Sequence, residues 1–185
     1  MARISLTPPR TLLNRFGAWY SRRAYGKVLE PGLAYGHNGR VLFTYVRLEQ
    51  QAAKWNALDG GLKHLAVMAA AARMNCSWCM DFGYWEGQEK GIAPEKVEKV
   101  PVWREAREAF TELELLVMEY AEAMTETEPA VTDELAAELI ERLGEAAFVE
   151  LTAMVALENM RSRVNSAFGL TSQGFKESCE IPAER

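Results

Sequence analysis

The sequence predicts an all-α fold, and three of its features indicate this. No stretch alternates convincingly between apolar and polar residues, as a half-buried strand would. Apolar residues recur instead every three or four positions, the spacing that places them on one face of a helix. Capping residues precede these segments, and glycine or proline follows them, as at the ends of helices. A chain of 185 residues is long enough for one such domain with an appended arm.

The N-terminal segment, residues 1–39, is predicted to be an irregular, basic and aromatic arm. Three prolines and five glycines fall within residues 8–39, so only one short helix is expected there, around residues 14–25. A basic segment without acidic residues also occurs in transit peptides and in nucleic-acid-binding arms. The aromatic side chains Trp19 and Tyr20 favour a different interpretation, an arm that packs against the acidic body or a neighbouring subunit.

Residues 40–170 predict a single helical domain, and residues 171–185 a polar C-terminal tail. Asn38, Thr111 and Thr132 stand where the caps of three helices belong. The alanine-rich helix begins at Asp59 or Gly60 and leaves little side-chain bulk on one side, which suits close helix packing. The expected helices are residues 40–54, 60–74, 75–91, 94–100, 112–124, 133–143 and 145–168.

The charge of the chain is uneven, and this bears on its partners. The first 29 residues carry six basic residues and no acid, whereas the remainder has 15 Lys and Arg against 26 Asp and Glu. An acidic body argues against nucleic acid as a partner. No apolar run approaches the roughly 20 residues that span a bilayer, and the N-terminus lacks a signal-peptide core. We therefore expect a cytoplasmic protein with no membrane partner.

The strongest functional signal is the pair Cys76 and Cys79, a Cys-x-x-Cys motif. If Asn75 caps the helix that follows, Cys76 occupies its first position and Cys79 lies one turn later. Both sulfurs then lie at the positive end of the helix dipole, which lowers a thiol pKa below its free value of about 8.5. The spacing also allows a disulfide to close with little backbone movement. This pattern is typical of a redox dithiol.

Other interpretations of the pair remain open at this stage. A structural zinc site needs about four ligands, and beyond the pair the chain offers only Cys179 and two separated histidines, so zinc would have to bridge subunits. Inert cysteines that pack as small apolar residues are the second alternative. We expect neither a metal nor a cofactor, and we expect Cys179 in the tail to be a bystander.

The surroundings of the pair resemble a known family. The stretch LKHLAVMAAAARMNCSWCMDFG is similar to the core motif of the carboxymuconolactone decarboxylase and alkylhydroperoxidase D superfamily, most clearly over residues 60–91. The resemblance implies a helical homo-oligomer whose thiol members reduce hydroperoxides. It implies that the second cysteine, Cys79, reacts first with peroxide, and that Cys76 resolves the sulfenic acid into a disulfide. A dithiol reductant, unknown here, then restores the pair.

The chain departs from the family pattern at two positions. Thiol peroxidases of the family carry a Glu twelve residues before the first cysteine and a His four residues after the second; these positions are His64 and Gly83 here. The chemistry still needs a base for the thiol proton and an acid for the leaving alkoxide. We therefore take Cys79, Cys76, His64 and Asp81 as the candidate catalytic residues. Tyr84 and Glu86 are further candidates for the missing group.

Two other groups of residues bear on function. Aromatic residues around the thiols line an apolar entrance or form core and interface contacts: Trp78, Phe82, Tyr84 and Trp85. Glu158, Arg161 and Asn165 share one helix face, which we expect to be solvated or interfacial rather than a buried cluster near the site. The sequence thus predicts a thiol-dependent oxidoreductase acting on a small organic hydroperoxide. The alternatives are a carboxymuconolactone decarboxylase-like enzyme and a non-catalytic oligomeric module.

Overall fold

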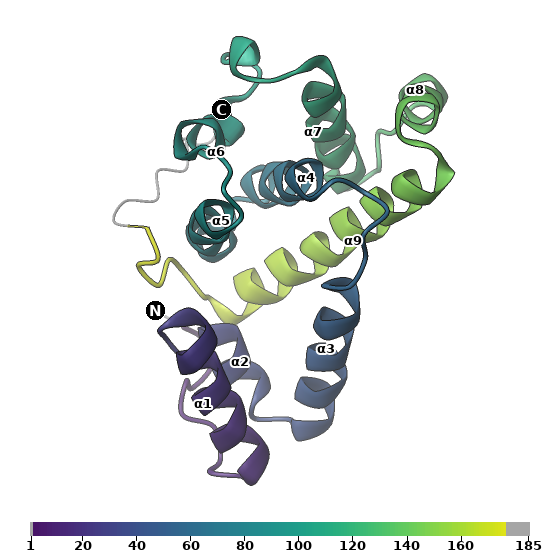
Figure 1. Ribbon diagram of the computed structural model, residues 1–185. Coiled ribbons are helices and arrows are strands. Elements are labelled where there is room, and N and C mark those ends of the chain that lie inside the picture. Colours follow the sequence, from purple (N-terminus) through teal and green to yellow (C-terminus); the bar gives the residue numbers. More distant parts are fainter. Residues whose placement is uncertain (1, 177–185) are drawn as a thin grey trace. The chain divides into compact units, whose positions relative to one another are not determined.

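The structure is a computed structural model that describes residues 2–176, and every regular element in that range is a helix. This confirms the predicted all-α class. Figure 1 follows the helices in chain order. Their bounds are α1 Leu12–Tyr25, α2 Glu30–Tyr35, α3 Gly39–Ala52, α4 Gly60–Arg73, α5 Ser77–Glu89, α6 Pro94–Lys99, α7 Glu112–Thr125, α8 Asp133–Leu143 and α9 Glu145–Phe168, with short 3-10 helices η1 Val100–Val102 and η2 Arg107–Ala109.

The chain forms two compact units, which divide it differently from the predicted boundary at residue 39. Unit 1 comprises Met1–Lys54 with Asn165–Thr171, and unit 2 comprises Trp55–Val164 with Ser172–Arg185. Helix α3 thus belongs with α1 and α2, because Tyr35 of α2 stacks on Tyr45 of α3 with ring centroids 4.4 Å apart. Helix α2 forms in a stretch predicted to be irregular. Pro31 lies in its first turn, where a missing backbone N–H removes no helical hydrogen bond.

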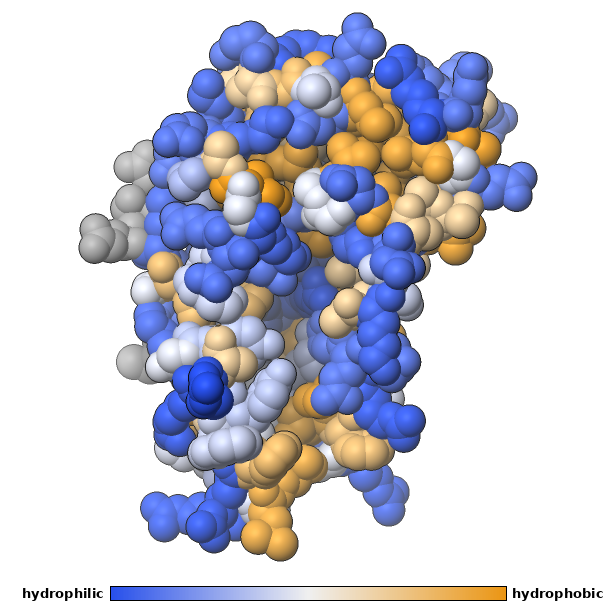
Figure 2. Space-filling model, in the orientation of Figure 1, coloured by the Kyte–Doolittle hydropathy of each residue, from blue (hydrophilic) through white to orange (hydrophobic). Residues whose placement is uncertain are grey.

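Unit 1 carries most of the exposed large apolar side chains that the structure describes. Of the eleven exposed large hydrophobic residues that the structure describes, nine belong to α1 and α3, among them Phe16, Trp19 and Phe43, which are 63%, 59% and 53% exposed. In the part of Figure 2 that holds these helices, apolar side chains lie at the surface among hydrophilic ones. The predicted caps of this region form, since Asn38 accepts a hydrogen bond from the Val41 N–H at the start of α3.

Helix α4 lies at the centre of unit 2, packed against α5, α7 and η1 (Figure 1). Its alanines at 66, 69, 70 and 71 are fully buried, so neighbouring backbones approach it closely, as the sequence predicted. Asp59 begins the helix by accepting hydrogen bonds from the N–H groups of Gly61 and Leu62. The predicted capping box of Thr111 and Glu114 likewise begins α7.

The contact between α4 and α5 depends on two glycines one turn apart on α5. A Cβ atom on Gly83 would collide with the Sδ atom of Met68, which is fully buried on α4. A Cβ atom on Gly87 would lie 2.9 Å from Nε2 of His64 and 3.1 Å from Cγ2 of Val97. His64 and Met68, also one turn apart, thus occupy the space that side chains at these two positions would need.

Helix α9 is held against unit 2 at several points. The carboxylate of Glu150 accepts a hydrogen bond of 2.6 Å from the Ala57 N–H and pairs with Lys63 of α4. Further along, the side-chain amide of Asn159 donates to the hydroxyl of Thr125 on α7 at 2.9 Å. These contacts fix the rotation of α9 about its axis, and with it the face that α9 turns toward α5.

Replacing Gly87 by Ala tests the close approach of α4 and α5. We expect Gly87→Ala to lower the free energy of unfolding by about 1 to 3 kcal/mol, because the buried His64 ring and Val97 leave no room for the methyl group. Thermal unfolding followed by circular dichroism measures the change. The matched control is Gly60→Ala at the start of α4, where an added Cβ meets nothing within 4 Å. Equal melting temperatures for the two variants would contradict this packing account.

Candidate redox site

The dithiol lies at the junction of α4 and α5, and Asn75 shapes that junction. Asn75 adopts a left-handed conformation with φ of 53°. Its N–H donates to the carbonyl of Ala72, and the N–H of Cys76 donates to that of Ala71. This pattern is a Schellman ending of α4, for which Asn is the usual alternative to Gly. The prediction that Asn75 caps α5 is therefore wrong, because Asn75 closes the preceding helix instead.

Cys76 is the N-cap of α5. Its backbone is not yet helical, and its sulfur accepts a hydrogen bond of 3.3 Å from the N–H of Cys79. The two cysteines form a disulfide with their Cα atoms 5.3 Å apart, and they are only 5% and 8% exposed. Helix α5 begins one residue later than predicted, with Cys76 as its N-cap and not its first residue. Both sulfurs still lie at the positive end of the helix dipole. The disulfide therefore spans the first turn of α5.

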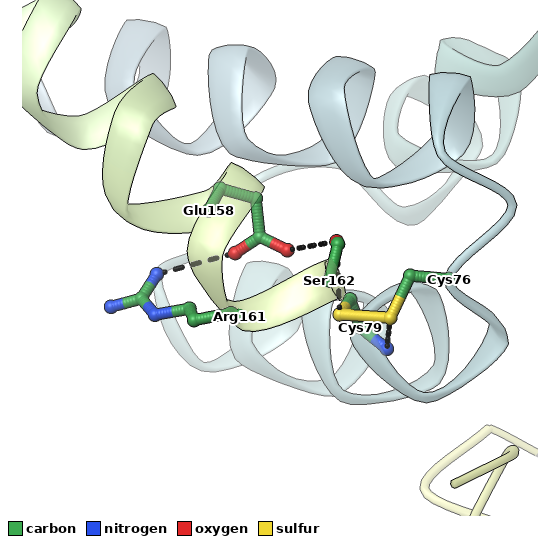
Figure 3. Close-up of a disulfide and its surroundings, with 5 residues drawn as sticks. All are labelled: Cys76, Cys79, Glu158, Arg161 and Ser162. Carbon is green, nitrogen blue, oxygen red and sulfur yellow. Dashed lines mark hydrogen bonds and ion pairs between the residues drawn. A yellow bond between two sulfur atoms is a disulfide. The ribbon is translucent and has the colours of Figure 1, made fainter. Parts of the chain in front are cut away.

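A hydroxyl and a carboxylate from α9 continue from the dithiol as a chain of two contacts, from Cys79 to Ser162 and from Ser162 to Glu158 (Figure 3). The Oγ atom of Ser162 lies 3.3 Å from Sγ of Cys79 and donates to Oε1 of Glu158 at 2.9 Å. Both residues are almost fully buried, with 1% and 2% of their surfaces exposed. The expectation that the face of Glu158, Arg161 and Asn165 is solvated or interfacial is therefore wrong for Glu158 and Asn165, which are buried.

The charge of Glu158 is balanced from its own helix. The Nη1 atom of Arg161 lies 3.3 Å from Oε2 of Glu158, the oxygen that does not face Ser162 (Figure 3). A buried carboxylate is strongly unfavourable unless a cation or hydrogen-bond donors accompany it. Arg161 and Ser162 supply both, one to each oxygen.

His64 lies away from the disulfide. Its Nε2 atom faces Gly87, eight residues beyond Cys79, which is about 12 Å along a helix. Its Nδ1 atom lies 3.7 Å from the carboxylate of Glu86, and neither ring nitrogen has a hydrogen-bond partner among residues 2–176. Burial would raise the pKa of Glu86, but His64 and Lys90 outweigh it and lower this pKa to about 2. The structure thus pairs His64 with Glu86 and not with the thiols.

Asp81 holds the C-terminal strap, which we define as residues 172–176. Its fully buried carboxylate accepts hydrogen bonds from the N–H groups of Gln173, Phe175 and Lys176, at 2.8, 2.9 and 2.6 Å. Burial would raise the pKa of Asp81, but these backbone donors outweigh it and lower the pKa below its usual range. Asp81 therefore stays ionised, and its carboxylate is occupied by hydrogen bonds from the strap. The strap lies at the start of residues 171–185, the segment predicted as a polar tail. Cys179 lies outside the described residues.

The aromatic side chains of α5 pack mainly on one another and on the strap. Phe82 stacks on Trp78 with ring centroids 5.2 Å apart and meets Phe175 of the strap edge-on at 5.4 Å. The indole N–H of Trp78 donates to the side chain of Gln173. Tyr84 carries the ammonium group of Lys176 over its ring at 3.8 Å. The sequence left two roles open for these aromatic residues, lining an apolar entrance or packing in the core and at interfaces. The contacts described are packing contacts.

Sequence reasoning missed Ser162, although a signal for it was present. Glu158, Arg161 and Ser162 are polar residues at spacings of three and four in a helix whose neighbouring positions, such as Val155, are buried and apolar.

Within residues 2–176, no group of three or more His, Cys, Asp or Glu side chains is placed to hold a metal ion. In the same range no helix combines the length and apolarity needed to cross a membrane.

Comparison with known proteins now identifies the family. Residues 41–123 match the carboxymuconolactone decarboxylase family. Over 178 residues the chain is 33% identical to the uncharacterized protein YnjA of Escherichia coli strain K12, covering 94% of both chains. The chain belongs to the carboxymuconolactone decarboxylase family. The resemblance seen in residues 60–91 is thereby confirmed.

Solved structures share the fold of this chain at low sequence identity. An uncharacterized peroxidase-related protein of Ralstonia eutropha JMP134, described as an alkylhydroperoxidase AhpD core, superposes with a TM-score of 0.83 at 15% identity, covering 98% of both chains. The debrominase Bmp8, solved in complex with 2,3,4-tribromopyrrole, superposes with a TM-score of 0.80 at 16% identity, covering 95% of both chains. These likenesses, both below 25% identity, show the fold alone.

Replacing Asp81 by Asn tests its hold on the strap. The amide keeps one acceptor oxygen and adds donors that face the strap N–H groups, so we expect exchange protection at residues 173, 175 and 176 to fall by at least tenfold. Amide exchange measured by NMR gives the protection factors. The matched control is Asp133→Asn, an exposed carboxylate on α8. Unchanged strap protection in Asp81→Asn would contradict the assignment.

The same contact predicts a pH dependence of the strap. The pKa of Asp81 is lower in the folded protein than the usual value of about 3.9, so its stabilising effect is complete above that value. It is lost as pH falls through the folded-state pKa, because the protonated acid is a weaker acceptor. We expect strap protection factors to be constant between pH 5 and 8 and to fall only below about pH 4.

Proposed function

We propose that the protein is a thiol-dependent oxidoreductase that reduces small organic hydroperoxides through Cys76 and Cys79. The observation that carries this proposal is the Cys76–Cys79 disulfide at the first turn of α5, where both sulfurs lie at the positive end of the helix. Membership of a family that includes thiol peroxidases supports it. The fold shared with an AhpD-core protein is consistent with it.

The reaction has two steps and balances within the dithiol. The Cys79 thiolate attacks the terminal oxygen of the hydroperoxide, so the S–O bond forms, the O–O bond breaks, and the alkoxide leaves and takes up a proton. The Cys76 thiolate then attacks the sulfenic acid sulfur, the disulfide forms, and hydroxide leaves as water. The dithiol loses two electrons and the peroxide gains them. A small-molecule or protein dithiol reductant reopens the disulfide by thiol exchange.

The local contacts support this division of roles between the two cysteines. The sulfur of Cys76 receives the Cys79 N–H, a contact that stabilises a thiolate ready to resolve the sulfenic acid. The sulfur of Cys79 instead faces a hydroxyl backed by a carboxylate, where a proton can be accepted. A peroxide-attacking cysteine needs such proton transfer because its substrate leaves as an alkoxide.

Two other activities of the superfamily are weaker candidates for this chain. A lactone decarboxylase works by proton transfer and makes no use of an oxidisable dithiol, so the disulfide argues against it. Debromination, the activity named for Bmp8, rests here on a shared fold at 16% identity. Both substrate classes belong in the assay as comparisons.

Titration of the reduced protein with cumene hydroperoxide tests the proposal. We expect one equivalent to close the Cys76–Cys79 disulfide within seconds, at least 100-fold faster than free cysteine reacts. Peptide mass mapping identifies the bond, and Trp fluorescence follows the rate. Cys79→Ser abolishes the rapid phase. Cys76→Ser retains it and accumulates a sulfenic acid at Cys79 that dimedone traps.

Three outcomes would count against the proposal. Oxidation no faster than that of free cysteine would remove the peroxidase function. A rapid phase that survives in Cys79→Ser but not in Cys76→Ser would reverse the assigned roles. Turnover of a lactone or a brominated pyrrole by protein inert to hydroperoxides would redirect the assignment to that substrate.

We also propose that the chain self-associates, with the apolar surface of α1 and α3 buried against a second copy. Nine of the eleven exposed large hydrophobic residues belong to these two helices, a concentration unusual for a monomer's surface. The basic residues of α1, Arg15, Arg22 and Arg23, have their complement in the acidic remainder of the same chain. A second copy therefore offers both an apolar and an oppositely charged surface.

Sedimentation velocity on the purified full chain tests self-association. We expect an oligomer for the wild type and a shift toward the monomer when Phe16 and Trp19 are both replaced by Glu, because charges would then enter an apolar contact. Val149→Glu is the matched control, an equally exposed apolar side chain on α9 that lies outside unit 1. A monomeric wild type, or equal effects of the two changes, would overturn this proposal.

A further inference from the structure

We propose that Ser162 and Glu158 of α9 form the proton relay of the dithiol, carrying the proton of Cys79 to the leaving oxygen of the substrate. Ser162 is the catalytic residue, since it touches the reacting sulfur, and Glu158 acts through it. The inference rests on the peroxidase function proposed above and names the acid–base groups of that site. In this chain neither position of the family's relay performs the task, because Gly83 has no side chain and His64 lies beside Gly87.

The geometry fits a relay in both protonation states. A serine hydroxyl donates one hydrogen bond while it accepts another. In the disulfide form Ser162 Oγ lies 3.3 Å from the Cys79 sulfur and donates to Glu158 at 2.9 Å. In the reduced form the Cys79 S–H donates to Ser162, and Ser162 donates to Glu158. After the proton has moved, the Glu158 acid donates to Ser162, and Ser162 donates to the thiolate, so every donor finds an acceptor in each state.

Glu158 is a buried carboxylate that reaches the dithiol through the hydroxyl of Ser162. The other buried glutamate of α9, Glu150, ties that helix to Lys63 and to the Ala57 N–H, so its charge fixes a contact between segments. Glu158 pairs with Arg161 and accepts the hydrogen bond of Ser162, both within one turn of it on α9. A buried carboxylate destabilises a fold unless its interactions compensate. Its position at the end of a chain of donors leading to Cys79 gives this one a chemical role.

The proton balance of the reaction then closes within the site. Ser162 takes the thiol proton of Cys79 and passes its own to Glu158, which leaves the thiolate that attacks the peroxide. When the O–O bond breaks, the proton returns through Ser162 to the alkoxide, which leaves as the alcohol. Glu158 is again ionised beside Arg161, and the net proton transfer runs from Cys79 to the substrate. General acid–base groups of this kind accelerate reactions by roughly 10² to 10⁴.

The relay predicts a dependence on the leaving group that a structural role does not. Cumene hydroperoxide releases a strongly basic alkoxide that needs a proton, whereas peracetic acid releases acetate, which needs none. We would measure disulfide closure by stopped-flow Trp fluorescence at pH 8.5. This pH is near the free thiol pKa, so a large share of the thiol is ionised even without the relay. The variants are Glu158→Gln and Ser162→Ala. The matched control is Ser166→Ala, an exposed hydroxyl one turn further along α9.

We expect both relay variants to react with cumene hydroperoxide about 100-fold more slowly and with peracetic acid within a few fold of the wild type. The double variant should be no slower than the slower single one, because the two groups act in series. Equal losses with both oxidants would assign a structural role and overturn the relay, as would no loss with either. If Glu158→Gln unfolds, Ser162→Ala decides alone. A wild type that reacts with hydroperoxide no faster than free cysteine would overturn the proposed function and the relay together.

Discussion

The close packing of α5 on the alanine face of α4 is the constraint on which the rest of the site depends. It requires glycine at 83 and 87, and it fills the space beside them with Met68 and His64. It also demands a tight link between the two helices, which the left-handed Asn75 provides. That link ends α4 and leaves Cys76 to begin α5, so the disulfide forms across the first turn. The position of the disulfide is in this sense a consequence of how the two helices meet.

The same packing explains why positions 64 and 83, where thiol peroxidases of the family carry Glu and His, hold other residues here. A side chain at position 83 would have to displace the buried Met68, and His64 is held between Gly87 and the carboxylate of Glu86. In the proposed reaction, acid–base chemistry therefore comes from another element. The face of α9 that carries Glu158 and Ser162 is available for it, because the contacts of Glu150 and Asn159 fix the rotation of that helix.

The fold could be predicted well because helix caps and apolar spacing act over a few residues. Prediction failed where the outcome depends on contacts between distant segments. Caps such as Asn38, Thr111 and Thr132 act within four residues, so the sequence alone identifies them. Asn75 suits either a cap or a left-handed ending, and only the meeting of two helices decides between them. Asp81 finds its partners more than 90 residues away, beyond any local pattern. The polar stripe on α9 was visible, but periodicity does not say whether such a stripe meets water or another helix.

At positions 173, 175 and 176 Asp81 recognises the strap through its main chain, since the donors there are backbone N–H groups. The carboxylate itself therefore places no demand on the side chains at these positions, with one exception. Proline has no N–H to donate, so related sequences that keep the carboxylate should lack proline at these three positions. Spacing is constrained as well, because an inserted residue would move the donors out of register with the carboxylate oxygens. In an alignment of related sequences, this interaction should appear as a strap of constant length without proline at these three positions. It need not appear as a conserved sequence motif.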